Sequence, residues 1–145
     1  MTTVRQLLQG KGTDIWSIEP DACVFDALKL MAEKRVGALL VLEADNLVGI
    51  FSERDYARKV ELEGKSSADT SVKEIMTGEV YCIRPEQTVE DCMALMTSRR
   101  IRHLPVLSDD RLEGVVSIGD IVKAVISEKE FMIQQLENYI VTSSS

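Results

Sequence analysis

The chain has 145 residues, of which 45% are hydrophobic and 28% charged, a composition typical of a globular protein and not of a disordered one. This length suits one domain, or two small ones that share a core. The net charge of −7 argues against binding to a nucleic acid polymer, which needs a basic face, but not against a small anionic ligand, because a pocket responds to its local charges. No apolar run is long enough to cross a membrane and the N-terminus lacks a signal-peptide pattern, so we expect a cytoplasmic protein with no membrane partner.

The chain repeats itself with an offset of 65 residues and no gap, pairing residues 15–58 with 80–123. Fifteen of the 44 aligned pairs are identical, which favours an internal duplication over chance similarity. Each copy is too short to bury a stable core alone, so we expect the two copies to pack together.

The elements of each repeat follow the same order. The first repeat has a lead-in at Thr3 to Leu8, and then a strand, a helix at Val24 to Met31, two strands joined by a polar turn, and a helix that begins at Ser52. The first strands are expected at Ile15 to Ile18 and Val80 to Ile83, and the paired strands at 38–42 with 47–51 and at 104–107 with 112–116. The prediction is an α/β (α+β) fold, with two β-α-β-β-α repeats packed as a pseudo-two-fold pair.

The boundaries between these parts follow from composition. We predict a first repeat with its lead-in at 1–60, a linker at 61–70, a second repeat at 71–126 with a helical lead-in at Ser71 to Met76, and a C-terminal helix with a frayed tail at 127–145. The C-terminal helix, at Glu128 to Val141, carries an apolar stripe that would be exposed on its own. It is therefore expected to pack on this chain or on a partner.

The cysteines do not indicate a metal site. Cys23, Cys82 and Cys92 lack the paired spacing of a zinc site, and His103 is the only histidine. Cys82 and Cys92 are expected to be buried free thiols, whereas Cys23 occupies the N-cap position of the first repeat's helix, where a helix N-terminus favours the thiolate. Thr88 holds the same position in the second repeat and is a better cap, with Asp91 three residues later.

A serine followed three residues later by an aspartate recurs at the second helix of each repeat, as Ser52 with Asp55 and Ser117 with Asp120. The first N–H groups of a helix and the positive end of its dipole attract an anion such as phosphate, and an aspartate in the first turn can accept two hydrogen bonds from a ribose diol. The same pattern is also a capping motif that needs no ligand, and both interpretations stay open on the residues alone.

The doubled pattern resembles a pair of cystathionine β-synthase (CBS) domains, known as a Bateman module. The resemblance rests on GIFSERD at Gly49 to Asp55, GVVSIGD at Gly114 to Asp120 and RHLPV at Arg102 to Val106, and it covers about Thr3 to Ile126. It implies a regulatory, non-enzymatic protein that binds an adenine nucleotide (AMP, or alternatively ATP or NAD(H)), forms a homodimer and signals to a regulated protein.

The resemblance also implies two ligand clefts between the repeats, in which Ser contacts phosphate and Asp the ribose. One cleft would combine Ser52, Arg54, Asp55, Val80 and Tyr81 with Arg102, His103 and Pro105. The other would combine Ser117, Ile118, Gly119 and Asp120 with Ile15, Trp16, Gly37 and Ala38. Because Arg102 and His103 replace Gly37 and Ala38 between the repeats, the two clefts are not equivalent.

Two functions follow as alternatives. The first is an adenine-nucleotide sensor without catalysis, since the chain has no P-loop, no GxGxxG and no nucleophile–base–orienter set. The second is a ligand-free interaction module, or a thiol-redox module that acts through Cys23.

Overall fold

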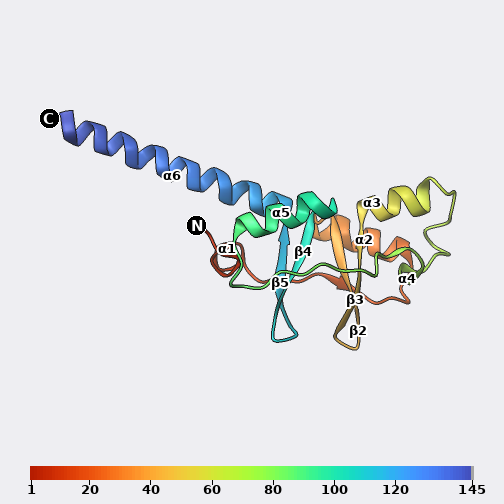
Figure 1. The fold of residues 1–145 in the computed structure, drawn as a ribbon. Coiled ribbons are helices and arrows are strands. Elements are labelled where there is room, and N and C mark those ends of the chain that lie inside the picture. The colour runs from red at the N-terminus through yellow and green to blue at the C-terminus, as the bar shows by residue number, and fades with distance from the viewer. Residues whose placement is uncertain (145) are drawn as a thin grey trace. The chain divides into compact units, whose positions relative to one another are not determined.

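The computed structural model describes residues Met1–Ser144, with side chains as far as Ile140. The chain forms two compact units that do not follow its linear order (Figure 1). Unit 1 comprises Met1–Thr13 and the chain from Cys82 onward, and unit 2 is the continuous segment Asp14–Tyr81. Helices and strands are mixed in both units, as the sequence predicts for an α+β fold.

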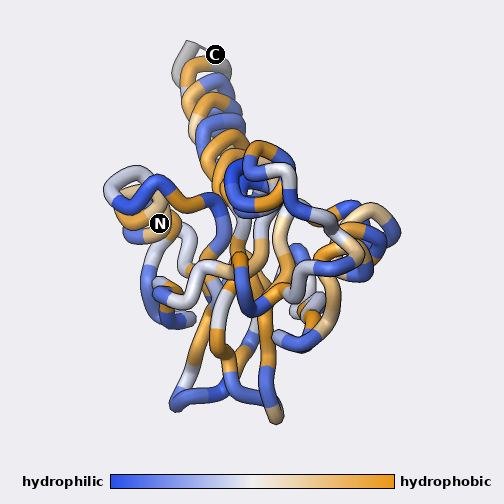
Figure 2. The backbone as a smooth tube through the Cα atoms, turned by 90° about the vertical axis from the view of Figure 1, so that its right-hand side faces the viewer, coloured by the Kyte–Doolittle hydropathy of each residue, from blue (hydrophilic) through white to orange (hydrophobic). Residues whose placement is uncertain are grey.

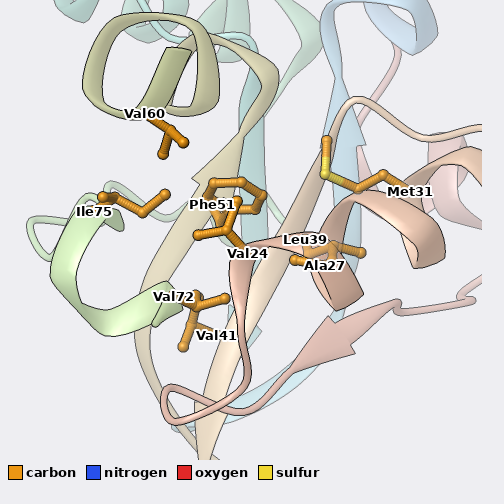
Figure 3. Close-up of a cluster of buried hydrophobic side chains, with 9 residues drawn as sticks. All are labelled: Val24, Ala27, Met31, Leu39, Val41, Phe51, Val60, Val72 and Ile75. Carbon is orange, nitrogen blue, oxygen red and sulfur yellow. The ribbon is translucent and has the colours of Figure 1, made fainter. Parts of the chain in front are cut away.

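Unit 2 carries the first repeat. Its elements are β1 (Ser17–Ile18), α2 (Val24–Lys34), β2 (Ala38–Glu43), β3 (Asn46–Ser52), α3 (Glu53–Tyr56), the π-helix η1 (Ala57–Glu61) and α4 (Val72–Ile75). The strands form one sheet in the order β1-β2-β3, in which β1 is parallel and β3 antiparallel to β2. Figure 3 shows its core, where side chains of α4 and η1 approach the buried ring of Phe51.

Unit 1 carries the second repeat. Its elements are α1 (Val4–Lys11), α5 (Val89–Arg99), β4 (His103–Ser108), β5 (Arg111–Ser117) and α6 (Ile118–Ser144). β4 and β5 form an antiparallel pair, and the first strand expected at Val80 to Ile83 is reduced to one parallel bridge between Ile83 and Val106. At this bridge the N–H of Ile83 donates to the carbonyl of Pro105 (2.9 Å) and the N–H of Leu107 donates to the carbonyl of Ile83 (2.9 Å).

Each lead-in helix packs in the unit of the other repeat. In unit 1, Val4 donates its N–H to the carbonyl of Gln87 (2.8 Å) and Val89 donates to that of Thr2 (2.9 Å). In unit 2, the N–H of Val72 likewise donates to the carbonyl of Ala22 (2.8 Å). The first N–H groups of a helix have no acceptor within that helix, and these carbonyl groups accept hydrogen bonds from them. Each lead-in helix therefore packs with the repeat that it does not directly precede in the sequence, while the expected boundaries between the repeats stay a prediction.

The N-termini of α2 and α5 confirm the expected contrast in capping. Thr88 caps α5 through a reciprocal pair of hydrogen bonds with Asp91, whereas the side chain of Cys23 makes no capping hydrogen bond to α2. Carbonyls of the linker replace that cap, because Thr70 accepts from the N–H of Val24 (2.8 Å) and Ser67 from that of Phe25 (3.0 Å). The start of α2 is thus satisfied without a polar N-cap side chain.

Helix α6 is longer than expected. The sequence predicts a helix at Ser117 and a separate one at Glu128 to Val141, but the structure has one helix at Ile118–Ser144. No glycine or proline follows Gly119 within this range, so nothing in the backbone breaks the helix. The frayed tail expected at 142–145 falls on residues whose side chains, and for Ser145 the backbone, lie outside the described residues. No helix among the described residues is long and apolar enough to span a membrane.

Candidate functional site

Ser52 and Asp55 form a closed cap where β3 meets α3. Asp55 Oδ2 accepts from the N–H of Ser52 (3.0 Å) and from its hydroxyl (3.1 Å), and the N–H of Asp55 donates back to Ser52 Oγ (3.2 Å). Asp55 Oδ1 accepts from Thr77 Oγ1 (3.0 Å) and lies 3.0 Å from Lys59 Nζ. Both oxygens of this buried carboxylate are therefore engaged by groups of unit 2.

Ser117 and Asp120 form the equivalent cap at the start of α6. Asp120 Oδ2 accepts from the N–H of Ser117 (2.8 Å), and the N–H of Asp120 donates to Ser117 Oγ (3.2 Å). Lys11, at the C-terminal end of α1, brings its ammonium to 2.6 Å from Asp120 Oδ2 and also donates to the carbonyl of Val115 (2.7 Å). Burial opposes ionisation of Asp120, but the hydrogen bonds from Lys11 and Ser117 outweigh it and hold the pKa of this carboxyl below its usual value.

The two aspartates differ in accessibility. The side chain of Asp55 is 8% exposed and that of Asp120 is 17% exposed. The hydrogen bonds from Ser117 and Lys11 both end on the same oxygen of Asp120, whereas protein donors reach both oxygens of Asp55. Asp120 is thus the better placed of the two to accept hydrogen bonds from a ligand.

The hairpins bring a second pair of predicted residues to each cap. His103 lies directly opposite Ser117 in the β4–β5 pair, and the N–H of Ile118 donates to the carbonyl of Arg102 (2.8 Å). Ala38 lies opposite Ser52 in the same way, and the N–H of Glu53 donates to the carbonyl of Gly37 (3.1 Å).

The resemblance implies the opposite combination, with Arg102 and His103 beside Ser52. It likewise implies Gly37 and Ala38 beside Ser117. The contacts described here lie within one unit each, so a cleft that combines both units stays a prediction. Within unit 1, the cap at Ser117 has a histidine and an arginine beside it. Within unit 2, the cap at Ser52 has only small residues there.

His103 gives unit 1 a pH dependence. Burial lowers the pKa of this imidazole below its ordinary value of 6.5, and Lys11 and Arg102 lower it further, although Asp120 opposes them. A base with a lowered pKa binds its proton more readily in the unfolded chain, so its contribution to stability is lost as the pH falls below about 6.5. We expect urea unfolding at pH 7.5 and 5.5 to show a larger loss of stability in the natural protein than in the His103→Gln variant. Equal losses would contradict this role for His103.

The other predicted residues are spread over several elements and loops. Trp16 precedes β1, and the ammonium of Lys34 lies 4.5 Å from the centre of its ring. The Tyr81 hydroxyl donates to Glu79 (3.1 Å) at the end of unit 2. Pro105 is buried in β4, and its contact with a ligand stays a prediction. Of the remaining predicted residues, Ile15 precedes β1, Arg54 lies in α3 and Val80 lies in the segment between α4 and α5, all in unit 2, whereas Gly119 lies in the first turn of α6 in unit 1.

Three residues that contact the aspartates were not predicted from the sequence as site residues: Lys11, Lys59 and Thr77. Lys59 follows Asp55 by four residues, a spacing at which helical side chains meet, and could have been identified from the sequence. Lys11 is separated from Asp120 by 109 residues and carries no such signal.

The cysteines and possible metal ligands give no second site. Among the described residues there is no group of three or more His, Cys, Asp or Glu side chains that could hold a metal ion. Burial raises the pKa of Cys82, and burial with nearby Asp91 and Glu90 raises that of Cys92 to about 11. A raised pKa lowers the thiolate fraction of both cysteines at neutral pH; Cys92 is buried as expected, whereas Cys82 is only half-buried.

Known proteins share this arrangement over most of the chain. Residues 11–62 and 72–127 match the family described as CBS domain, so the chain belongs to that family and carries two of its domains in tandem. It is 42% identical to the mitochondrial CBS domain-containing protein CBSX3 of Arabidopsis thaliana, over 96% of this chain and 72% of that protein.

Solved structures agree with this assignment. A CBS-domain protein of Burkholderia ambifaria has 52% sequence identity and a TM-score of 0.85, and the match covers 87% of this chain and 95% of that one. A CBS-domain containing protein of Agrobacterium tumefaciens has 39% identity and a TM-score of 0.81, over 85% of this chain and 98% of that one. The protein is thus a tandem CBS module, and such modules are regulatory as a class.

Proposed function

We propose that the protein is a regulatory sensor of adenine nucleotides, which binds AMP, with ATP and NAD(H) as the alternative ligands, and passes the ligand state to a partner without catalysis. The observation that carries this proposal is the ionised Asp120 at the start of α6, held by Lys11 and Ser117 with His103 beside it. The proposal also rests on the membership of the CBS family and on what that family binds.

The chemistry of the residues around Asp120 suits a nucleotide. A carboxylate kept ionised accepts hydrogen bonds from the two hydroxyls of a ribose, and hydrogen bonds to a charged group contribute about 1.5–3 kcal/mol each. The N–H groups of Ile118 and Asp120 already donate to Arg102 and Ser117, so at this end of α6 a phosphate is favoured by the positive end of the helix dipole. Lys11, Arg102 and His103 supply positive or hydrogen-bonding groups in a protein whose net charge is −7.

The site at Asp55 is proposed as the weaker of the two. A ribose there would have to replace the donors Thr77 and Lys59 on a buried carboxylate. At Asp120, Lys11 is the donor that a ligand would meet, and its side chain is 32% exposed and can turn toward a phosphate.

The test is calorimetry with AMP, ATP and NAD(H). We expect the Asp120→Ala variant to lose at least ten-fold in affinity, equivalent to about 1.4 kcal/mol. Asp91→Ala is the matched control, because Asp91 has the same place in the cap of α5 within the same unit and is expected to leave the affinity unchanged. If no adenine nucleotide binds the natural protein, or if both variants bind equally, the proposal fails.

Signalling requires a second state and a partner. A ligand changes the balance between two conformations only when it binds them with different affinity. We propose that the states differ in the arrangement of a homodimer and that a regulated protein reads the difference. A CBS-CP12 protein from bloom-forming cyanobacteria, 31% identical, with a TM-score of 0.74, is hexameric, which supports self-association in the family.

We propose the cytoplasm as the location of the protein described here. The alternative to test is the mitochondrion, which the name of the Arabidopsis relative gives.

A further inference from the structure

One face of α6 is an exposed apolar stripe with the spacing of a coiled coil. The residues of this stripe, here called the seam, alternate at intervals of four and three: Val122, Ile126, Lys129, Ile133, Leu136 and Ile140. Its apolar side chains are between 49% and 63% exposed. Figure 2 shows hydrophobic and hydrophilic positions alternating along α6.

The seam lies on a different face of α6 from the one that packs on unit 1. Ile121 is 1% exposed, and Glu128 accepts a hydrogen bond from the backbone N–H of Thr2 (2.9 Å). From Lys129 to Ile140 every side chain is exposed, and the helix extends away from β4 and β5 (Figure 1). A continuous apolar stripe on a helix in water indicates a surface that another element covers.

We propose that the seam pairs with the seam of a second copy of this chain, with the two α6 helices antiparallel. This inference specifies the interface of the proposed homodimer. It does not depend on nucleotide binding.

Charge decides between the two orientations. In a parallel pair with matched residues, Lys129 of one copy would face Lys129 of the other within an apolar seam, at a cost in stability. In an antiparallel pair centred near Phe131, Lys129 faces Ile133 of the second copy instead. Ile126 then faces Leu136, and Val122 faces Ile140, so apolar side chains face each other in every layer of the seam except the two that contain Lys129.

The flanking charges agree with the antiparallel register. Lys123 on the edge of the seam meets Glu137 of the second copy, and this pair occurs twice in the dimer. Glu130 of the two copies meet near the centre, where Lys129 of both copies lies next to them and offsets the repulsion. In this register each exposed C-terminal half lies along the domain-bound half of the other helix, so the two copies of unit 1 lie toward opposite ends of the pair.

The first experiment measures the mass in solution by sedimentation velocity across a concentration series. The natural protein is expected to be a dimer and Leu136→Glu to be monomeric, or at least ten-fold weaker in association. Phe131→Glu is the matched control, because Phe131 is also 61% exposed on α6 but lies off the seam, and it is expected to dimerise like the natural protein. A dimer that Leu136→Glu does not weaken overturns the seam but not the homodimer, whereas a monomeric natural protein overturns both and leaves nucleotide binding to be decided by calorimetry.

The second experiment tests the orientation by exchanging charges. Lys123→Glu turns two attractive pairs into repulsive ones and is expected to weaken dimerisation about ten-fold at low salt. Adding Glu137→Lys to Lys123→Glu recreates both pairs with their signs exchanged and should restore the natural affinity to within about three-fold. In a parallel dimer these two residues do not meet, so failure of the double variant to recover would overturn the antiparallel arrangement.

Discussion

Replacing Asp55 by alanine is expected to lower the free energy of unfolding by about 3 kcal/mol, because a buried carboxylate with several partners is lost. Its oxygens accept hydrogen bonds from Ser52 and Thr77 and face the ammonium of Lys59. Removing it leaves the N–H of Ser52 at the start of α3 and the hydroxyl of Thr77 without their acceptor. Lys59 is 43% exposed and can return to water, which limits the loss.

The measurement is urea unfolding of Asp55→Ala beside Asp91→Ala. Asp91 occupies the same capping position in α5 but is exposed, so its replacement should cost about 1 kcal/mol. Equal losses in the two variants would show that Asp55 acts as an ordinary cap. In that case the contacts of Asp55 with Thr77 and Lys59 do not contribute to the free energy of unfolding. Asp55 then becomes as good a candidate for ligand binding as Asp120.

Replacing a buried valine in either lead-in helix is expected to destabilise the unit in which that helix packs. Val4 in α1 and Val72 in α4 are both fully buried, so replacing either by alanine leaves a cavity and should cost about 2 kcal/mol. Because α1 belongs to unit 1, Val4→Ala should loosen α5, β4 and β5. Val72→Ala should loosen the core around Phe51 in unit 2 (Figure 3).

Hydrogen exchange followed by mass spectrometry distinguishes the two effects, since it reports local opening segment by segment. In Val4→Ala, peptides from 103–117 are expected to exchange faster than in the natural protein, and those from 38–52 to stay unchanged. The reverse is expected for Val72→Ala. If Val4→Ala accelerates exchange in 38–52 instead, the lead-ins belong to the repeats that follow them in the sequence.

The hairpins and caps were predictable because short-range chemistry determines them. Thr88 with Asp91, and each Ser with its Asp, are separated by three residues, which is the spacing of a capping pair. The polar turns between apolar runs predicted β2–β3 and β4–β5, and Ala44, Asp45, Asp109 and Asp110 adopt the positive φ that a two-residue hairpin turn requires. Counting back from the second turn would have placed His103 opposite Val116, because the sequence does not reveal the register shift between Val106 and Leu107 that brings His103 opposite Ser117.

The long-range contacts were not predictable in this way. The expected boundaries follow the linear order of the repeats, and nothing in the pattern of TVRQLL shows that its helix completes the unit of the second repeat. The contact of Lys11 with Asp120 depends on that exchange, so it could not be inferred without it. The continuous α6 was not predicted for a different reason. The second repeat was expected to end before a separate helix at Glu128, although no glycine or proline marks a boundary there.

The exchanged lead-ins affect the order in which the molecule can assemble on the ribosome. Unit 2 is one continuous stretch, so it can fold as soon as Tyr81 has left the exit tunnel. Unit 1 needs Met1–Thr13 and residues from Cys82 onward, so its first helix must wait, with Val4, Leu7 and Leu8 uncovered, until the second half has been synthesised. During that interval α1 is a nascent apolar segment open to chaperones, and early termination of translation would leave it without its partner.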